Sequence, residues 1–230
     1  LAAALELVDR GHEVTLLEAR PTLGGAVQTL PRRDDDPEPP PDNGQHIALG
    51  CFSSYLRFLD RIGSLSRVRR LPLRLPVIDE RGRVAAIGYG AGPLLRYRHV
   101  SLGDRLRILS LAARLPRLAV GEGTFGDFLR AHGQSDVAIE RFWDVFVRPA
   151  LNLRTDDVAA ADAVFTVLTA LRSGRAASEV VLPMAPLGEL HGEAARRALE
   201  AAGATVATGE RVSDLDELDA DAVVMALPPA

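Results

Sequence analysis

Cysteine is almost absent from this sequence, since Cys51 is the only one in 230 residues. A single thiol allows no internal disulfide and no zinc or iron–sulfur site built from several cysteines of this chain. Such sparing use of cysteine fits a reducing compartment. The patterns H-E-x-x-H and G-x-S-x-G are also absent, which disfavours a metal hydrolase and a serine hydrolase. We therefore predict no metal site.

Positive charge is not in excess either, with 27 Lys and Arg against 31 Asp and Glu and a pI near 5.8. No basic run is interleaved with aromatic residues, so we expect no nucleic-acid partner. No stretch reaches the about 18 uninterrupted apolar residues that a membrane-spanning helix needs. With 47% apolar and 25% charged residues, the profile is that of a soluble globular protein.

The beginning of the chain has half of a dinucleotide-binding signature. Apolar residues at helical spacing are followed by Gly11, then by an apolar strand at 14–17 that ends on Glu18. The other half of the signature, G-x-G-x-x-G after a first strand, comes roughly 20 residues before such an acid. Neither precedes Glu18, and the chain opens on Leu1. We therefore expect a fragment that lacks one strand and its glycine loop.

The middle of the chain mixes loops, strands and helices. Residues 31–43 are packed with proline and acid, which predicts a loop. Residues 44–63 turn helical, and 72–89 predict two short strands joined by a turn. Residues 101–172 predict mainly helices, one of them capped by Thr124. The helical segment at 44–63 shows an apolar face made of Tyr55, Phe58, Leu59 and Ile62.

The end of the chain returns to an α/β pattern. Residues 186–202 predict an amphipathic helix closed by Gly203, and 204–212 a strand and turn. Residues 221–230 are apolar on both faces, which predicts a strand inside a parallel sheet. We therefore predict an α/β nucleotide-binding domain interrupted by an insert. The predicted boundaries are 1–70 for its first part, 71–183 for the insert and 184–230 for its second part.

The "LEA" that contains Glu18 and the "GG" at 24–25 resemble the FAD-dependent amine oxidase and carotenoid desaturase superfamily. Within it, the sequence is most similar to the hydroxysqualene dehydroxylases, also called squalene-associated FAD-dependent desaturases, of hopanoid biosynthesis. Three segments carry this narrower likeness: "DNGQHIALGCFSSYLRFLDRIG" at 42–63, "LPLRLPVIDERGRV" at 71–84 and "FWDVFVRPALNLRTDDVAAADA" at 142–163. The resemblance implies FAD as the cofactor and a Rossmann-like FAD-binding domain, truncated at both ends, with an inserted α+β substrate domain.

The first flavin contacts implied lie around the glycine pair. Glu18 can accept two hydrogen bonds from a ribose diol, or it is a surface acid after a strand. Gly24 and Gly25 can adopt positive φ and let backbone approach a ligand, or they form an ordinary turn. Arg20 can pair with phosphate or with the acidic loop at 34–36.

The segment "DNGQH" is the most informative polar cluster. By resemblance it passes the flavin near its reactive centre, with Gly44 allowing close approach and Gln45 and His46 as catalytic residues. The alternative is that His46 is a helix-capping or partly buried histidine. Asp42 and Asn43 are good turn and N-cap residues in either case.

Two other positions bear on the flavin site. The superfamily commonly has an arginine after the glycine pair, but this sequence has Ala26, so that contact is absent. The resemblance also implies that the backbone of Val212 contacts the adenine end of FAD; otherwise Val212 is a core valine. The superfamily's last flavin motif does not occur before Ala230, which we interpret as a second truncation.

The insert is expected to bind substrate. Residues 103–119 place four arginines among leucines, a pattern of membrane-interface helices or of ordinary amphipathic ones. Pro149 is expected to break a helix and Asn152 to cap or face substrate. An apolar tunnel, or alternatively a core, is indicated by Phe142, Trp143, Phe146, Phe165 and Leu168.

The function that we predict is reductive dehydroxylation of hydroxysqualene to squalene, with His46 as the candidate proton donor. The alternatives are a carotenoid or phytoene-type desaturase, an amine oxidase, and a lipid- or partner-binding fragment without catalysis. The implied partners are a hydrophobic polyprenoid and a reductant that the sequence does not identify. We expect a cytoplasmic protein, or one peripheral at the inner face of the cytoplasmic membrane, and we expect the fragment alone to be inactive.

Overall fold

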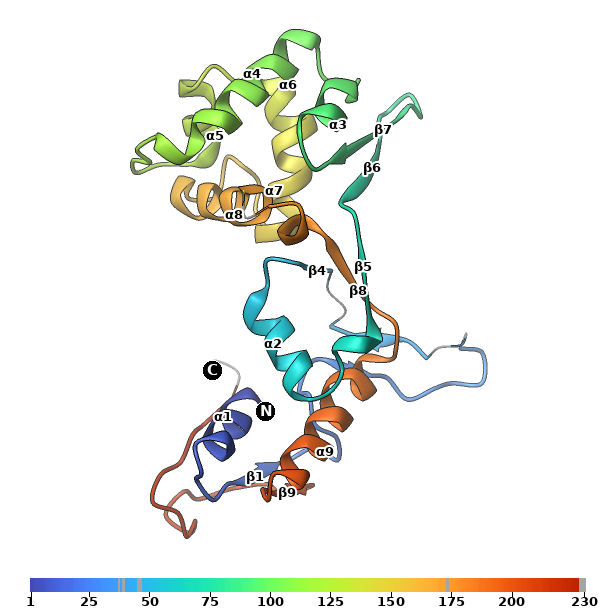
Figure 1. Cartoon of the computed structure of the whole chain (residues 1–230), viewed down its shortest axis with the longest axis vertical. Helices are drawn as coiled ribbons and strands as arrows, with labels where there is room; N and C mark the ends of the chain where they lie inside the picture. Colours follow the sequence, from blue (N-terminus) through green and yellow to red (C-terminus); the bar gives the residue numbers. More distant parts are fainter. Residues whose placement is uncertain (37, 39, 45–46, 173, 228–230) are drawn as a thin grey trace. The chain divides into compact units, whose positions relative to one another are not determined.

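A computed structural model of the chain describes residues 1–36, 38, 40–44, 47–172 and 174–227. The chain divides into two compact units (Figure 1). The first is made of Leu1–Ile47, Ser53–Arg69 and Leu182–Ala230, and the second of Ala48–Phe52 and Arg70–Val181. The chain thus leaves the first unit and returns to it twice. That the two units serve cofactor and substrate, with functional boundaries after residues 70 and 183, stays a prediction.

The first unit contains a parallel pair of strands, as its two α/β patterns predict. Strand β1 (Thr15–Glu18) pairs with β9 (Thr205–Thr208), in register from Thr15 opposite Thr205 to Glu18 opposite Thr208. Helix α1 (Ala2–Asp9) precedes β1, and α9 (Ala194–Ala201) precedes β9. Because the two strands are parallel, their carboxyl ends lie at the same edge of the sheet. Glu18 and the residues after β9 are therefore neighbours.

The core of the first unit also includes helix α2 (Ser53–Arg61), a 3-10 turn η1 (Leu65–Arg67) and a π-helical turn η5 (Gly188–Glu193). The predicted apolar face of α2 is confirmed, because Leu59 and Ile62 are buried and Tyr55 and Phe58 pack against the same core. Leu5, Leu190 and Leu199 complete its buried centre. Burial of each such side chain stabilises the unit by about 1.5–3 kcal/mol.

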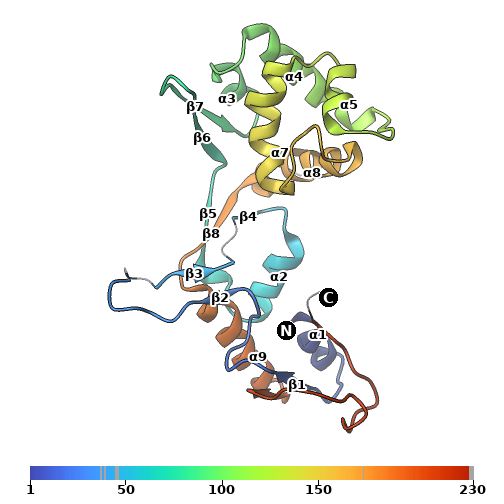
Figure 2. The ribbon, with the colours of Figure 1, turned by 180° about the vertical axis from the view of Figure 1, so that it is seen from behind.

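The predicted loop at 31–43 is wrong at its end. Strand β3 (Asp42–Asn43) pairs antiparallel with β2 (Gln28–Thr29), with Thr29 opposite Asp42 (Figure 2). The ladder is only two residues long, so no alternation in the sequence reveals it. It closes the proline-rich segment into a hairpin whose base lies beside the glycine pair.

The second unit combines a hairpin with a helical layer, as predicted. Strands β6 (Arg74–Ile78) and β7 (Val84–Gly88) pair antiparallel. The chain has three further strands, β4 (Ala48–Leu49), β8 (Val180–Pro183) and β5 (Val68–Leu71), which form a sheet in the order β4-β8-β5. Two of these strands, β5 and β8, include residues of the first unit. The sequence predicted none of these three strands. The helix predicted over 44–63 is wrong at its start, because Ala48 and Leu49 pair with β8 and the helix covers only Ser53–Arg61. The helices are α3 (Ala91–Arg96), α4 (Leu102–Arg114), η2 (Leu115–Arg117), α5 (Phe125–Ala131), α6 (Asp136–Ala138), η3 (Ile139–Trp143), α7 (Asp144–Leu151), α8 (Ala160–Arg172) and η4 (Ala176–Ser178).

Pro149 does not break its helix where the sequence predicts. It lies inside α7, which runs two residues further, to Leu151. The helix ends because Asn152 adopts a left-handed conformation (φ 56°), and its N–H donates to the carbonyl of Arg148 at 2.9 Å. The capping role of Asn152 is thus confirmed, whereas the stop assigned to Pro149 is wrong because a proline this close to the end disrupts few helical bonds.

The apolar strand predicted at 221–230 is also wrong over its described part, 221–227. These residues form no strand, and Val224, Met225 and Leu227 are exposed. A strand needs a neighbouring strand to accept its hydrogen bonds, and within the described residues this segment has none. Apolar composition alone does not supply such a partner.

Candidate functional site

Glu18 lies at the carboxyl end of β1, where the loop after β9 meets it. Its Oε1 accepts a hydrogen bond from the backbone N–H of Arg20 at 2.8 Å. The carbonyls of Glu18 and Arg20 accept from Glu210 and Gly209, each at 3.0 Å. Glu18 is half-buried. A carboxylate is therefore fixed at a strand end by local bonds, in the place that the sequence predicts.

The glycine pair forms the turn that follows. Gly24 has φ 115° and Gly25 φ 61°, which confirms the positive φ expected at both positions. A Cβ on Gly24 would lie 2.5 Å from the carbonyl oxygen of Val27, so no other residue fits there. The guanidinium of Arg20 donates to the carbonyl of Gly25 at 3.3 Å. Glu18, Arg20, Gly24 and Gly25 are thus brought together.

Gly44 belongs to the same site. It has φ 72°, and a Cβ on it would lie 3.0 Å from the carbonyl oxygen of Ala26. The side-chain amide of Asn43 donates to that same oxygen at 2.6 Å. Asn43 is expected to suit a turn or an N-cap; it instead ends β3, and its side chain bonds the glycine turn rather than capping a helix. Gln45 and His46 lie outside the described residues, so their catalytic assignment stays a prediction.

Val212 lies beyond the end of β9, in irregular chain, and is exposed. It is therefore not a core valine, the alternative that the sequence left open. Its backbone contact with an adenine ring stays a prediction.

The first unit contains a buried histidine to which no pattern in the sequence points. His191 lies in η5, and its Nδ1 donates to the carbonyl of Leu187 at 3.1 Å, since a carbonyl can only accept. Its Nε2 lies 2.9 Å from the hydroxyl of Tyr55 and accepts from it in the neutral ring. Burial lowers the pKa of the His191 imidazole, which favours this neutral form. A histidine inside an amphipathic helical pattern gives no sequence signal of this contact.

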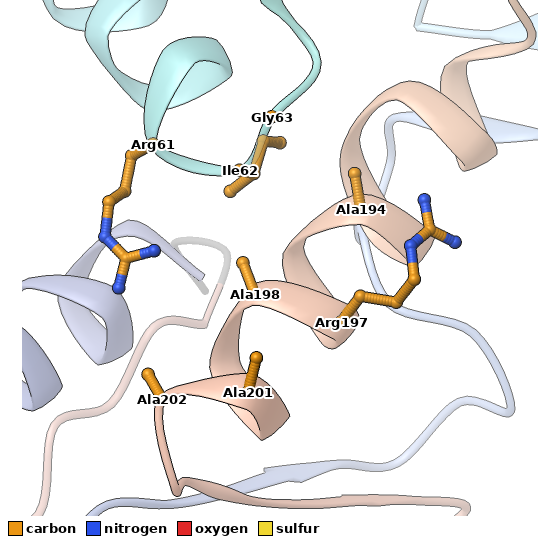
Figure 3. Close-up of a pocket in the computed structure, with 8 residues that line it drawn as sticks. All are labelled: Arg61, Ile62, Gly63, Ala194, Arg197, Ala198, Ala201 and Ala202. Carbon is orange, nitrogen blue, oxygen red and sulfur yellow. The ribbon is translucent and has the colours of Figure 1, made fainter.

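Two open hollows in the described part of the chain contain no predicted site residue. The first, of about 410 Å³, is shallow and open and lies between the end of α2 and α9 (Figure 3). Alanines of α9 line it together with Arg61 and Arg197. The second, of about 350 Å³, lies in the second unit beside Asp79 and His99. Neither is assigned to the cofactor.

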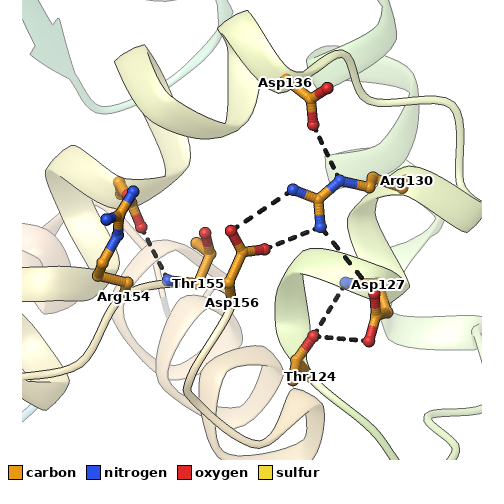
Figure 4. A network of polar contacts seen from close by, with 8 residues as sticks. Thr124, Asp127, Arg130, Asp136, Arg154, Thr155 and Asp156 are labelled. Carbon is orange, nitrogen blue, oxygen red and sulfur yellow. Dashed lines mark hydrogen bonds and ion pairs between the residues drawn. The ribbon is translucent and has the colours of Figure 1, made fainter.

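A match to the phosphate-loop pattern also occurs in the second unit, "GEGTFG" at 121–126. Thr124 caps α5 by accepting from the N–H of Asp127 at 3.1 Å. A Cβ on Gly126 would collide with the carboxylate of Asp156, which bonds Arg130 (Figure 4). Packing of a carboxylate explains this glycine, and α5 follows no strand, so the segment is not a dinucleotide loop.

The arginine-rich helix is largely used inside the second unit. Its apolar face, Ile108, Leu111 and Leu115, belongs to the buried core. The Arg105 guanidinium donates to the carbonyls of Val100 and Leu95. Among the residues that the structure describes, no helix is long and apolar enough to cross a membrane.

The aromatic residues predicted to line a tunnel divide differently. Phe142 and Trp143 are buried in the core of the second unit, where Trp143 donates from its ring nitrogen to the Gln134 amide oxygen at 3.1 Å. Phe146 packs partly against that core, while Phe165 is 70% exposed. The core interpretation of Phe142 and Trp143 is therefore confirmed.

In the described residues, no group of three His, Cys, Asp or Glu side chains is arranged so that it could hold a metal ion. The ion-pair network around Arg130 instead joins it to three acids, Asp127, Asp136 and Asp156 (Figure 4). These contacts hold α5 to the loops beside it.

The chain is similar to known proteins in both sequence and structure. A zeta-carotene desaturase of chloroplasts or chromoplasts from Zea mays is 25% identical over 192 residues, covering 74% of this chain and 33% of the relative. The chain thus spans about a third of that relative's length. An oxidoreductase from Methanosarcina mazei matches with a TM-score of 0.63 at 18% identity, over 90% of this chain and 48% of that one. The Rab GDI of Plasmodium falciparum matches with a TM-score of 0.63 at 13% identity, over 94% and 57%.

At such identities the structural likeness shows the fold alone, a mixed α/β fold shared with oxidoreductases. The family model described as "Flavin containing amine oxidoreductase" matches residues 1–230. The chain therefore belongs to the family of flavin-containing amine oxidoreductases, which implies FAD as the cofactor.

Proposed function

We propose that the full-length protein is an FAD-dependent oxidoreductase that converts hydroxysqualene to squalene by reductive dehydroxylation. The observation that carries the flavin part is the meeting of Glu18, the turn at Gly24 and Gly25, and Gly44 in one unit. The substrate rests on the resemblance of the segments at 42–63 and 71–84 to hydroxysqualene dehydroxylases.

The residues present fit the ADP half of FAD. In the described structure, Oε2 of Glu18 has no hydrogen-bond partner, so it is available to a ribose hydroxyl. The close approaches at Gly24 and Gly44 leave bare backbone where a side chain would stand. The Arg20 guanidinium lies against the turn and supplies a cation for the pyrophosphate.

FAD supplies a hydride when reduced and accepts one when oxidised. The C–O bond of the substrate breaks with departure of water, for which His46 is proposed to hold the proton at a ring nitrogen. Apolar residues of the second unit are proposed to exclude water from the polyprenoid. We expect His46→Ala to lose turnover while FAD content stays unchanged.

A second candidate function is carotenoid desaturation, in which the substrate gives up the hydride. The similarity to a zeta-carotene desaturase, over 74% of this chain, favours it. Both candidates share a long hydrophobic isoprenoid substrate and differ in the direction of hydride transfer.

Substrate trials with purified full-length protein separate the two. Chemically reduced protein given hydroxysqualene should release squalene, measured by gas chromatography and mass spectrometry. When a carotene is added to the oxidised protein, the visible absorption of the carotene should stay unchanged. New conjugated double bonds from the carotene, with hydroxysqualene left intact, would reverse the choice.

A non-catalytic lipid- or partner-binding role is the third candidate, since a Rab GDI shares this fold. Purified full-length protein with flavin absorbance argues against it. A colourless protein that cannot be reconstituted with FAD would favour it.

We further propose that the second unit binds the substrate and that the protein works in the cytoplasm, peripheral to the inner face of the membrane. Leu102 and Leu106 are exposed on α4 next to Arg107, a basic and apolar pairing that suits an anionic lipid surface. Flotation with anionic vesicles, compared with neutral ones, tests this contact.

A further inference from the structure

One carboxylate joins three segments of the first unit that are far apart in sequence. Oδ1 of Asp42, in β3, accepts a hydrogen bond from the Thr29 hydroxyl at 2.7 Å and from the Leu187 N–H at 3.0 Å. The Thr29 oxygen accepts from the Gly188 N–H at 2.9 Å. The directions are settled because an N–H only donates and a carboxylate only accepts. We call Asp42 and Thr29 the clamp.

The clamp takes the place of a helix N-cap. The first N–H groups of a helix have no partner within it, and Ser, Thr, Asp or Asn at the N-cap normally satisfies one of them. The N-cap of η5 is Leu187, which has no side-chain acceptor. Asp42 and Thr29 supply both oxygens from 145 and 159 residues away in the sequence. These bonds fix the start of η5, and with it α9, to the strand pair β2 and β3, which we call the ribbon.

The same ribbon carries both halves of the proposed flavin site. Thr29 ends the loop that starts after Glu18 and contains Gly24 and Gly25. Asp42 precedes Asn43, which bonds the loop at Ala26, and then Gly44. The position of the clamp consequently fixes the glycine turn relative to the segment that leads to the predicted catalytic residues.

The loop that contains the glycine pair is packed tightly against η5. A Cβ on Gly192 would lie 2.5 Å from the Leu23 carbonyl oxygen, and one on Gly188 would lie 3.2 Å from the Thr29 Oγ1. The loop thus lies directly against η5 at two places, Gly188 and Gly192. A shift of Thr29 or Leu23 relative to η5 must move the glycine turn with it.

We propose that Asp42 and Thr29 are positioning residues for FAD, acting through the glycine turn and Gly44. This inference rests on the proposed flavin function. Loss of the Thr29 hydroxyl leaves the Gly188 N–H without an acceptor and removes one of the two donors to Asp42. The glycine turn then loses its fixed distance from Gly44, although every residue of the turn is unchanged.

The test uses the full-length protein in matched pairs. Thr29→Val removes the hydroxyl at nearly constant shape, and Thr29→Ser keeps it. Asp42→Ala removes the acceptor, and Asp42→Asn keeps an oxygen in its place. Asp9→Ala is the control, since it breaks the ion pair with Arg61 in the same unit without touching the ribbon. The readouts are FAD dissociation constant, visible circular dichroism of the bound flavin, and melting temperature of the FAD-free protein.

We expect Thr29→Val and Asp42→Ala to weaken FAD binding about tenfold or more, the size of one lost hydrogen bond to a charged group. Their flavin circular dichroism should change even at saturating FAD, a signal that general destabilisation does not move. Thr29→Ser and Asp42→Asn should restore both readouts.

Wild-type affinity and an unchanged spectrum in Thr29→Val and Asp42→Ala would overturn the inference. The inference would also be overturned if FAD affinity fell only in proportion to the melting temperature, with Asp9→Ala showing the same relation. If the wild type bound no FAD, the proposed function itself would fall, which distinguishes the two failures.

Discussion

Gly192 is the position at which one added methyl group should most directly displace the candidate site. It lies in η5, and a Cβ there would be 2.5 Å from the Leu23 carbonyl oxygen and 3.1 Å from its carbon. The partner atoms are backbone, so no flexible side chain can move aside. The loop must retreat by roughly half an ångström or more to reach ordinary contact distances.

Two effects of Gly192→Ala oppose each other. Alanine favours a helix over glycine by about 0.8–1.0 kcal/mol in the interior. Forcing a methyl group into a packed contact costs typically about 1–3 kcal/mol. The free energy of unfolding therefore falls by about 0–2 kcal/mol. The structural displacement falls mainly on the loop at Gly24 and Gly25.

The assay pairs urea unfolding with FAD titration in the full-length protein. Gly103→Ala is the matched control, because Gly103 also lies in a helix and the nearest atom to its Cβ is 3.7 Å away. The control should be neutral or slightly stabilising and leave FAD affinity alone. Gly192→Ala with the stability and FAD affinity of Gly103→Ala would refute the reasoning.

Two further predictions concern stability. Gly126→Ala should lower the melting temperature, because its Cβ would displace the Asp156 carboxylate from Arg130; a melting curve equal to wild type would contradict this. The free energy of unfolding should fall as pH drops below about 6.5, because burial depresses the His191 pKa and the unfolded chain then binds the proton more readily. His191→Gln should remove that part of the pH dependence, and Tyr55→Phe should cost about 1 kcal/mol at neutral pH by leaving Nε2 without its donor. Urea midpoints measured between pH 5 and 8 check both the His191→Gln and the Tyr55→Phe variants. If stability depended on pH in His191→Gln as it does in the wild type, the assignment to His191 would be contradicted.

Patterns that repeat along the chain predicted their elements well. The apolar face of α2 shows the helical period because one side of the helix meets the core, and the sequence records that burial directly. The sharing of one sheet by the two ends of the chain followed from the order of helices and strands there, although the direct pairing of β1 with β9 was not predicted. Glu18 and the glycine pair were placed correctly because each depends on a few adjacent residues.

Contacts between distant segments left no such record. The β2 and β3 ladder is two residues long, and the clamp joins Asp42 to a backbone group 145 residues away. An aspartate before asparagine and glycine reads equally well as a turn. The apolar run at 221–227 misled for the converse reason, since its composition suits a strand but hydrogen-bond partners decide whether one forms.

The most direct test of the central claim is FAD binding by the full-length protein and by its Glu18→Ala variant, measured by titration and by flavin absorbance. The account predicts that the wild type binds one FAD per chain and that Glu18→Ala binds it about tenfold more weakly or worse, because the ribose loses a charged acceptor. A wild type that binds no FAD, or a Glu18→Ala variant with unchanged affinity, would contradict the assignment of this site.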